Sequence, residues 1–211
     1  MDNLPRLILV ADRFTESDRQ VRVFDAVRAG VPWIHLRDHE ADDATFRRAA
    51  VSLTEQIEAE GGGTRISVNQ RLDVADDLGL DYHAGSHGAG VQEARDRLGA
   101  SAIIGYSAHE DQEVTGARSE IVDYLFYSPI FPTSSKPDHP GMGLAELSRV
   151  CAVSTRPVFA LGGITPERVT PCLRKGAHGV AVLSGLMEAK DVRVAAEEYL
   201  QRLASIRQYE E

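Results

Sequence analysis

Short apolar runs rich in β-branched residues alternate with longer amphipathic runs along the whole 211-residue chain. This alternation constrains the fold most, because the short runs predict buried strands and the amphipathic runs predict helices. We predict strands at Leu7–Ala11, Trp33–Arg37, Arg65–Asn69, Tyr82–Ala84, Ala102–Ser107, Tyr124–Ser128, Val158–Leu161 and Gly179–Leu183. We predict helices near Arg19–Ala29, Asp43–Glu60, Arg71–Leu78, Val91–Leu98, Gln112–Arg118, Leu144–Val153, Pro166–Lys175 and Val192–Gln208.

Each predicted strand is followed by a predicted helix. A helical crossover returns the chain to the same end of the sheet, so the strands must pair in parallel, and eight such units close a barrel. We therefore expect an α/β protein with a single (β/α)8 TIM barrel, forming one domain over residues 1–211. The alternative is an open, doubly wound sheet, but the first strand–helix junction, Leu9-Val10-Ala11-Asp12-Arg13, lacks the Gly-x-Gly-x-x-Gly of dinucleotide-binding folds.

Charge and composition exclude several classes of partner. The chain has 32 acidic and 23 basic residues and a net charge of -9, so its overall field repels nucleic-acid phosphates and anionic lipids. No apolar stretch approaches the roughly 18 residues of a membrane helix, and residues 1–6 are too short and polar for a signal peptide. Two cysteines, Cys151 and Cys172, are too few for a disulfide framework. We expect a cytoplasmic protein with reduced core thiols and no nucleic-acid or membrane partner, while a homo-oligomer stays open.

Two glycine-rich turns after the last two predicted strands indicate a phosphate-binding site. Gly162 and Gly163 precede a Thr-Pro helix start, and Ser184 and Gly185 follow the next strand. Glycines let the backbone approach an anion closely, and a helix start directs its N–H groups at the ligand. We expect a larger residue at Gly163 to weaken phosphate binding and to leave the fold intact. The alternative is that these segments are only tight turns.

A loop after the sixth predicted strand offers three hydroxyl groups and one ammonium group in succession. The residues are Thr133, Ser134, Ser135 and Lys136. Such groups suit a phosphate or a diphosphate, and the loop could close over the site as a lid. The alternative is a solvated loop that binds nothing.

Histidines gather at the predicted carboxyl ends of strands, where barrels carry their chemistry. They are His35, His39, His83, His87 and His109. Strand periodicity places His35, Arg37 and His39 on one face, and Gly105, Ser107 and His109 on another. A structural, hydrogen-bonded role is the alternative for each histidine. His83 and His87 are four residues apart across a turn, which is only weak support for a metal site.

Five segments carry a resemblance to a known family: Ile34-His35-Leu36-Arg37-Asp38, Ile66–Ala75, Ile104–His109, Tyr127–Lys136 and Ala160–Ile164. In order and spacing they resemble the thiamine phosphate synthase superfamily along almost the whole chain. The resemblance implies a (β/α)8 barrel that acts in thiamine biosynthesis. One branch joins a pyrimidine diphosphate to a thiazole phosphate, and the other, the thiazole tautomerase, aromatises a thiazole phosphate carboxylate.

The sequence departs from the synthase branch at three positions implied by this resemblance. His39 stands where the synthase has Lys, while Gln70 and Gly88 stand where it has the carboxylates that bind magnesium. A diphosphate bridged by Mg²⁺ requires hard oxygen ligands of that kind. His35 and Tyr127 resemble the tautomerase branch instead, whereas the segment Ser128–Lys136 is closer to the synthase.

Our leading hypothesis is a metal-independent, thiazole tautomerase-like isomerase that binds a phosphorylated heterocyclic small molecule and needs no cofactor. The resemblance aligns His109 with the catalytic histidine, and histidine can accept and return a proton near neutral pH. The expected substrate-binding residues are His35, Arg37, His39, Asn69, Gln70, Ser107, Thr133, Ser134, Ser135 and Lys136, with the phosphate on Gly162, Gly163, Ser184 and Gly185.

Two alternatives stay open. The first is a thiamine phosphate synthase with a relocated or histidine-assisted Mg²⁺ site, in which Lys136 and Arg37 grip the diphosphate. The second is a non-catalytic binding or regulatory paralogue that retains the phosphate site.

Overall fold

A closed barrel of eight parallel strands forms the centre of the molecule, in a computed structural model that describes residues 4–61, 63–85, 90–109, 111–116 and 121–207. The strands are β1 (Leu7–Asp12), β2 (Trp33–Arg37), β3 (Arg65–Asn69), β4 (Asp81–Ala84), β5 (Ile104–Ala108), β6 (Tyr124–Tyr127), β7 (Val158–Leu161) and β8 (Gly179–Val182). They pair in chain order, and β8 pairs with β1 to close the ring. The expected (β/α)8 barrel is confirmed, and the open sheet is excluded.

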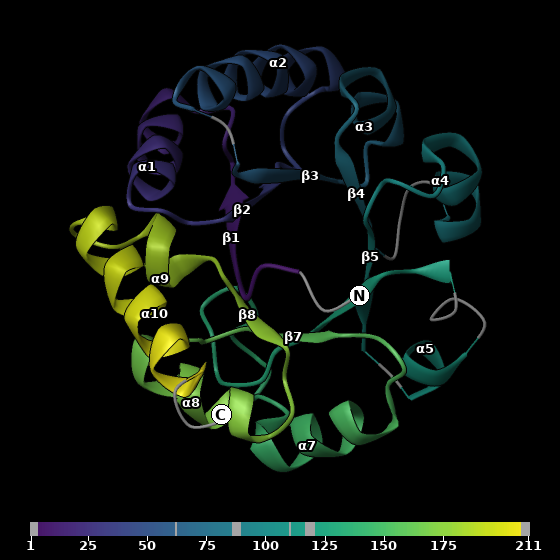
Figure 1. Ribbon diagram of the computed structural model, residues 1–211, viewed down its shortest axis with the longest axis vertical. Helices are drawn as coiled ribbons and strands as arrows, with labels where there is room; N and C mark the ends of the chain where they lie inside the picture. The colour runs from purple at the N-terminus through teal and green to yellow at the C-terminus, as the bar shows by residue number, and fades with distance from the viewer. Residues whose placement is uncertain (1–3, 62, 86–89, 110, 117–120, 208–211) are drawn as a thin grey trace.

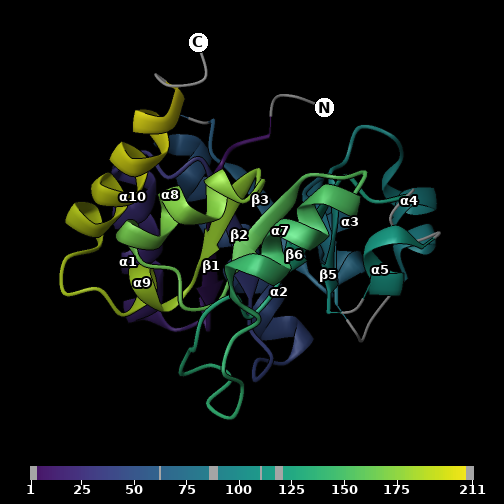
Figure 2. The same ribbon diagram turned by 90° about the horizontal axis from the view of Figure 1, so that it is seen from below.

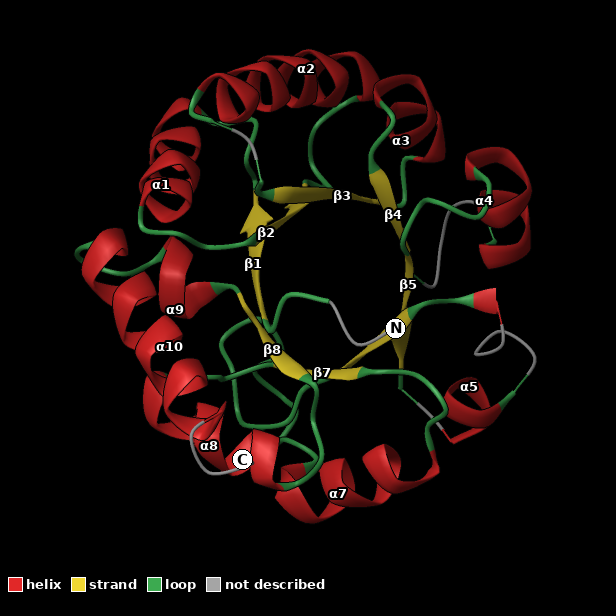
Figure 3. Ribbon diagram, viewed as in Figure 1, coloured by secondary structure: helices red, strands yellow, loops and turns green. Residues whose placement is uncertain are grey.

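The helices surround the barrel as an outer ring (Figures 1 and 3). They are α1 (Ser17–Arg28), α2 (Asp43–Ala59), α3 (Leu72–Leu78), α4 (Val91–Leu98), α5 (Asp111–Thr115), α7 (Gly143–Val153), α8 (Pro166–Arg174), α9 (Ser184–Met187) and α10 (Val192–Arg207). Among the described helices, none combines the length and the apolar character that crossing a bilayer requires.

The elements lie where the sequence pattern predicts them, with small differences at their ends. β5 begins at Ile104 instead of Ala102. At this point the backbone N–H groups of Ile103 and Ile104 donate to the carboxylates of Asp81 and Asp123, at 2.8 Å each, and not to a neighbouring strand. The short helix α9 was not predicted, because its Ser-Gly start is typical of a turn. The predicted ends at residues 117–118 and 208 fall outside the described residues.

Side chains of the strands alternate between two apolar cores, as period-two patterning requires. One core fills the barrel, and its buried members are Ile8, Val10, Trp33, Tyr124, Phe126, Phe159 and Ala181. The other lies between the barrel and the helices and includes Leu9, Ile34, Val68 and Leu125. Full burial of each large apolar side chain contributes about 1.5–3 kcal/mol, so both faces of the strands stabilise the fold.

The interior of the barrel is not apolar throughout. His35, Ser67 and His83 are buried together with the aromatic residues at 2%, 0% and 1% exposure. Burying a polar group is costly unless it is hydrogen-bonded. His35 contacts Ser67, and His83 contacts Tyr124 and Ser107, so this polar layer is hydrogen-bonded, and it lies beneath the cavity described next.

Candidate functional site

A cavity of about 260 Å³ opens at the carboxyl end of the barrel. The loop between β6 and α7 projects beyond the helix ring (Figure 2), and three of its residues, Thr133, Ser135 and Lys136, line this cavity. Every expected site residue except Ser134 lines it: His35, Arg37, His39, Asn69, Gln70, Ser107, His109, Thr133, Ser135, Lys136, Gly162, Gly163, Ser184 and Gly185. The structure therefore brings these residues together, whereas the side chain of Ser134 is exposed outside the cavity wall.

His35 and His83 form the floor of the cavity together with Phe126. The two imidazole rings meet edge to face with their centroids 5.0 Å apart, and the centroids of the His83 and Phe126 rings are 4.3 Å apart. Burial lowers the pKa of His35 to about 3, with the charge of Arg37 adding to the effect, and burial also lowers the pKa of His83 far below its usual value. Both rings are therefore neutral and serve as hydrogen-bonding groups.

His83 had no assigned role among the expected site residues, and Phe126 was not expected at the site. Period-two alternation on β4 and β6 would have found both, because His83 and Phe126 occupy inward positions of their strands. Tyr127, in contrast, was matched to the tautomerase branch but does not line the cavity. It points outward, and its hydroxyl donates to Glu146 of α7 at 3.2 Å.

Arg37 and His39 form the wall at the end of β2. The Arg37 guanidinium pairs with the carboxylate of Asp12, its direct neighbour in the strand register. The charge of Arg37 is therefore partly compensated before any ligand binds. Burial lowers the pKa of His39, and the charge of Arg37 contributes in the same direction.

The loop that carries His39 is held by buried polar contacts. The Asp38 carboxylate accepts hydrogen bonds from the Thr15 hydroxyl at 2.6 Å and from the backbone N–H groups of Glu40 and Ala41 at 3.0 Å each. Arg71 donates to the carbonyl oxygen of Asp38 at 2.9 Å. These contacts fix the start of the β2–α2 loop and with it the position of His39.

His109 lies at the rim, just after β5. Its backbone N–H donates to Glu113 at 2.7 Å, and the other carboxylate oxygen of Glu113 accepts from Tyr106 at 2.6 Å. Its Nδ1 atom lies 3.3 Å from the carbonyl oxygen of Ser128. A carbonyl oxygen only accepts, so Nδ1 carries the proton in this contact, and the lone pair of a neutral ring is at Nε2.

The glycines after β7 pack closely against the loop that follows β6. The backbone N–H of Phe131 donates to the carbonyl oxygen of Gly162 at 3.1 Å. Gly163 has a φ of +63°, and a Cβ atom there would lie 2.5 Å from the carbonyl oxygen of Pro132. This packing argues against our expectation that a larger residue at Gly163 leaves the fold intact, because the chain would have to shift.

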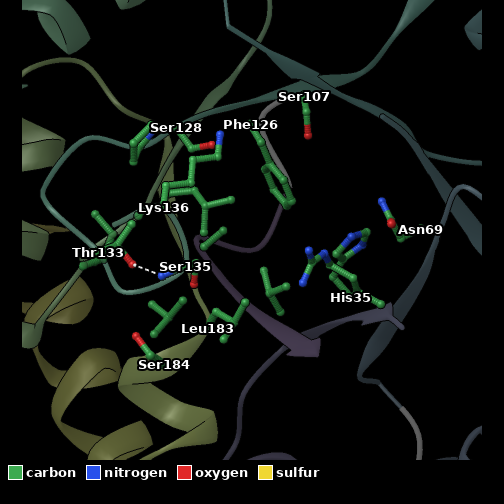
Figure 4. A pocket seen from close by; sticks show the side chains of 18 of the residues that line it. His35, Asn69, Ser107, Phe126, Ser128, Thr133, Ser135, Lys136, Leu183 and Ser184 are labelled. Carbon is green, nitrogen blue, oxygen red and sulfur yellow. Dashed lines mark hydrogen bonds between the residues drawn. The ribbon is translucent and has the colours of Figure 1, made fainter. Parts of the chain in front are cut away.

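The β6–α7 loop turns back on itself between Thr133 and Lys136. Thr133 and Lys136 form an isolated bridge, and the backbone N–H of Lys136 donates to the carbonyl oxygen of Thr133 at 3.1 Å. Figure 4 shows Thr133, Ser135 and Lys136 on one side of the cavity, with Ser184 nearby and Asn69 and His35 on the other side. Hydroxyl and ammonium groups therefore face the imidazole floor across the cavity.

The described residues do not fit the magnesium ion of the synthase branch. None of the cavity-lining residues is Asp or Glu, and the described residues contain no cluster of three or more His, Cys, Asp or Glu side chains that could hold a metal ion. The nearby carboxylates of Asp12 and Asp38 are engaged in the contacts described above. Gln70 lines the cavity with a neutral amide, and His87 and Gly88 lie outside the described residues.

Comparisons with known proteins agree with the geometry of a barrel enzyme. The family model described as thiamine monophosphate synthase matches residues 7–186. A thiamine-phosphate synthase of Methanoculleus marisnigri is 38% identical over 182 residues, which cover 85% of this chain and 85% of that protein. One of Thermobifida fusca is 34% identical over 204 residues, 95% of this chain and 93% of that protein.

A solved structure is also similar to this chain over almost its whole length. Thiamine phosphate pyrophosphorylase from Pyrococcus furiosus superimposes with a TM-score of 0.76 at 26% identity, covering 95% of this chain and 96% of that one. These relatives are named for the coupling reaction, so the comparisons favour the synthase alternative over the tautomerase. With the family model matching from β1 to α9, the chain belongs to the thiamine monophosphate synthase family and is an enzyme of the thiamine biosynthesis type.

Proposed function

We propose that the chain is a thiazole tautomerase-like isomerase, which aromatises a thiazole phosphate carboxylate by histidine-mediated proton transfer. The observation that carries this proposal is the donor set of the cavity. Its described walls supply imidazole, amide, hydroxyl and two cationic groups but no carboxylate. Departure of a diphosphate depends on a hard cation with oxygen ligands, whereas a proton transfer between two ring carbons does not. These side chains suit the second reaction without a cofactor.

His109 is the proposed acid and base. Its Nδ1 contact with Ser128 leaves the Nε2 lone pair to take a proton from one ring carbon. The same nitrogen then returns the proton to another carbon, so the reaction consumes no proton overall. General acid–base catalysis of this kind contributes typically about 10²–10⁴-fold.

The remaining residues would bind and orient the substrate. The turn at Gly162 and Gly163 and the α9 start at Ser184 and Gly185 border one side of the cavity, where backbone amides suit a phosphate. Lys136 adds a positive charge there. Asn69 and Ser107 would orient the ring from the other side. Arg37 would hold the carboxylate with guanidinium N–H groups that Asp12 does not use, since the group has five donors.

The coupling of a pyrimidine diphosphate to a thiazole phosphate is the second candidate. The observation in its favour is that the curated relatives are named thiamine-phosphate synthases. In that reaction Lys136 and Arg37 would grip the diphosphate, and Thr133, Ser134 and Ser135 would hold the loop closed. The metal site would have to use ligands other than the carboxylates typical of magnesium.

Parallel assays of the two reactions separate these candidates. We expect aromatisation of thiazole phosphate carboxylate to proceed in excess chelator, and we expect little coupling at any Mg²⁺ concentration. His109→Asn should lower kcat by about 10²-fold or more with a small change in KM, as a group acting in the transition state would. The control is His178→Asn, because Nε2 of His178 lies 2.9 Å from the carbonyl oxygen of Leu4 and the residue does not line the cavity.

Two other outcomes would replace the proposal. Strong Mg²⁺-dependent coupling would establish the synthase reaction. Inactivity in both assays, with phosphate binding retained by calorimetry, would identify a non-catalytic binding or regulatory paralogue.

A further inference from the structure

Two helices behind the proposed phosphate site send polar side chains to the turn after β7. α8 and α10 pack side by side on the outside of the barrel (Figures 1 and 3). From α8, Nη1 of Arg168 donates to the carbonyl oxygen of Gly163 at 2.5 Å. From α10, the Tyr199 hydroxyl donates to the carbonyl oxygen of Ile164 at 2.8 Å. Two consecutive carbonyl groups of the turn are therefore bound by side chains of the outer helices.

Arg168 also contacts the loop on the other side of the turn. Its guanidinium lies over the Phe131 ring, 4.4 Å from the ring centroid, which is an attractive cation–π arrangement. The backbone N–H of Phe131 in turn donates to the carbonyl oxygen of Gly162 at 3.1 Å. Arg168 therefore joins the turn after β7 to the start of the β6–α7 loop.

Tyr199 lies between the two segments that border the proposed phosphate site. The residue is 1% exposed, and burial raises the pKa of its phenol, so the hydroxyl keeps its proton and donates it. A Cβ atom at Gly185 would lie 2.2 Å from the Tyr199 hydroxyl oxygen and 3.2 Å from the carbonyl oxygen of Ile164. The absence of a side chain at residue 185 therefore leaves the space that this hydrogen bond occupies.

The two carbonyl contacts fix the direction of two N–H groups. In a trans peptide, the carbonyl oxygen and the N–H of the same planar unit point in opposite directions, and both of these peptides are trans. The N–H groups of Ile164 and Thr165 therefore point away from Arg168 and Tyr199. Neither N–H has an acceptor among the described residues, as is usual for donors at the start of a helix.

The orientation of these peptides decides what the turn offers a ligand. N–H groups attract the oxygens of an anion, whereas carbonyl oxygens repel them. Gly162 and Gly163 have φ angles of +94° and +63°, and glycine allows many backbone conformations at little cost. Two glycines alone therefore do not hold the peptides in one orientation, and contacts from outside the turn are needed.

We propose that Arg168 and Tyr199 are positioning residues, which hold the carbonyl groups of Gly163 and Ile164 outward and keep the turn as a hydrogen-bond donor to an anion. The inference rests on the phosphate site of the proposed function and adds the groups that orient it. Gly163 and Ile164 line the cavity, whereas Arg168 and Tyr199 do not. Both side chains therefore act through the backbone.

Binding of inorganic phosphate to the full-length protein tests this inference without any substrate. Tyr199→Phe removes only the hydroxyl and retains the ring and the net charge. Arg168→Met removes the contact with the carbonyl oxygen and retains a long side chain. We expect calorimetry to show phosphate binding weakened by roughly 2- to 10-fold in each variant, which corresponds to the net contribution of one hydrogen bond.

Each variant has a matched control away from the cavity. Tyr127→Phe also removes the hydroxyl of a buried tyrosine, which donates to Glu146. Arg22→Met removes a guanidinium contact with another backbone carbonyl, that of Ala189 at 2.7 Å, and it changes the net charge equally. Both controls should bind phosphate as the wild type does, even where Tm falls.

Amide ¹H–¹⁵N spectra add a readout that a loss of stability alone does not change. Phosphate should shift the Ile164 and Thr165 signals of the wild type, and at equal phosphate concentration the shifts should be smaller in Tyr199→Phe. The proposal is overturned if Tyr199→Phe binds phosphate as tightly as the wild type, or if the controls lose as much affinity as the variants they match.

The wild-type spectra decide if neither variant folds, because an absence of any response from these two amides also contradicts the inference. The outcome for the proposed function is separate. Phosphate binding that depends on Tyr199, in a protein without isomerase activity, would support the positioning role and refute the proposed reaction alone.

Discussion

Replacing Gly163 with alanine tests why the β7–α8 turn contains glycine. Gly163 has a φ of +63°, and its Cβ would lie 2.5 Å from the carbonyl oxygen of Pro132 and 2.9 Å from Cβ of Phe131. Gly79, at the end of α3, has nearly the same φ of +62°, but nothing lies within 4 Å of its Cβ position. The pair therefore separates the cost of the backbone conformation from the cost of close packing.

The expected magnitudes follow from these two contributions. A left-handed conformation costs an alanine roughly 1–2 kcal/mol, and this is the only cost at Gly79. Gly163→Ala adds the displacement of the β6–α7 loop, and overpacking costs about 1–3 kcal/mol. For a chain of this size, 1 kcal/mol corresponds to about 2–4 °C in Tm. Gly163→Ala should therefore lower Tm by about 2–12 °C more than Gly79→Ala does.

Thermal unfolding followed by circular dichroism measures both variants under the same conditions. Phosphate binding to the folded variants, by calorimetry, then shows whether the shifted loop also weakens the anion site. Equal losses of Tm in Gly163→Ala and Gly79→Ala would refute the packing argument. The close approach of a bound anion would then be the remaining reason for glycine at residue 163.

Three further results are expected. Burial alone would raise the pKa of Asp38, but the hydrogen bonds from Thr15 and two backbone amides outweigh burial and lower the pKa. The contribution of the Asp38 carboxylate to stability is therefore present above about pH 4 and is lost as the pH falls through the folded-state pKa. Asp38→Asn should cost about 1.5–3 kcal/mol at neutral pH and weaken the acid dependence of urea unfolding. Burial raises the pKa of Cys151 to about 11 and that of Cys172 to about 12, so alkylation of the native protein at neutral pH should be much slower than that of the unfolded chain. Gly105→Ala should lower Tm by overpacking, because its Cβ would lie 2.1 Å from the Tyr124 ring and 2.4 Å from Nδ1 of His83, and an unchanged Tm would contradict this packing.

Local sequence patterns predicted the secondary structure of this molecule and the facing of its strand residues. The strand and helix positions follow from periodicity, and the inward face of β2 follows from alternation, which brings His35, Arg37 and His39 to one cavity. The pairing of Arg37 with Asp12 could not be predicted in this way. It depends on the register between β1 and β2, which no local pattern in either strand specifies.

The glycine turn after β7 was interpreted from the sequence as a phosphate site, with a tight turn as the alternative, and its packing against another loop was not predicted. The sequence shows two glycines before a helix, which is compatible with an anion site or with a tight turn. The positive φ of Gly163 and its approach to Pro132 depend on the path of a loop about thirty residues earlier. Such contacts between separate loops are tertiary, so composition and spacing do not reveal them.

The two sides of the cavity differ in the kind of group they offer a ligand. On one side, consecutive strands from β2 to β6 supply buried hydrogen-bonding side chains, in which His35 contacts Ser67, and His83 contacts Tyr124 and Ser107. Across the cavity, the turn after β7 and the start of α9 bring glycine and serine backbone to the wall, with Lys136 on the loop beside them. Neutral fixed donors and acceptors suit the heteroatoms of a ring, while backbone amides and an ammonium group suit an anion. This division agrees with the ligand that we propose, a phosphorylated heterocycle, which both candidate reactions require.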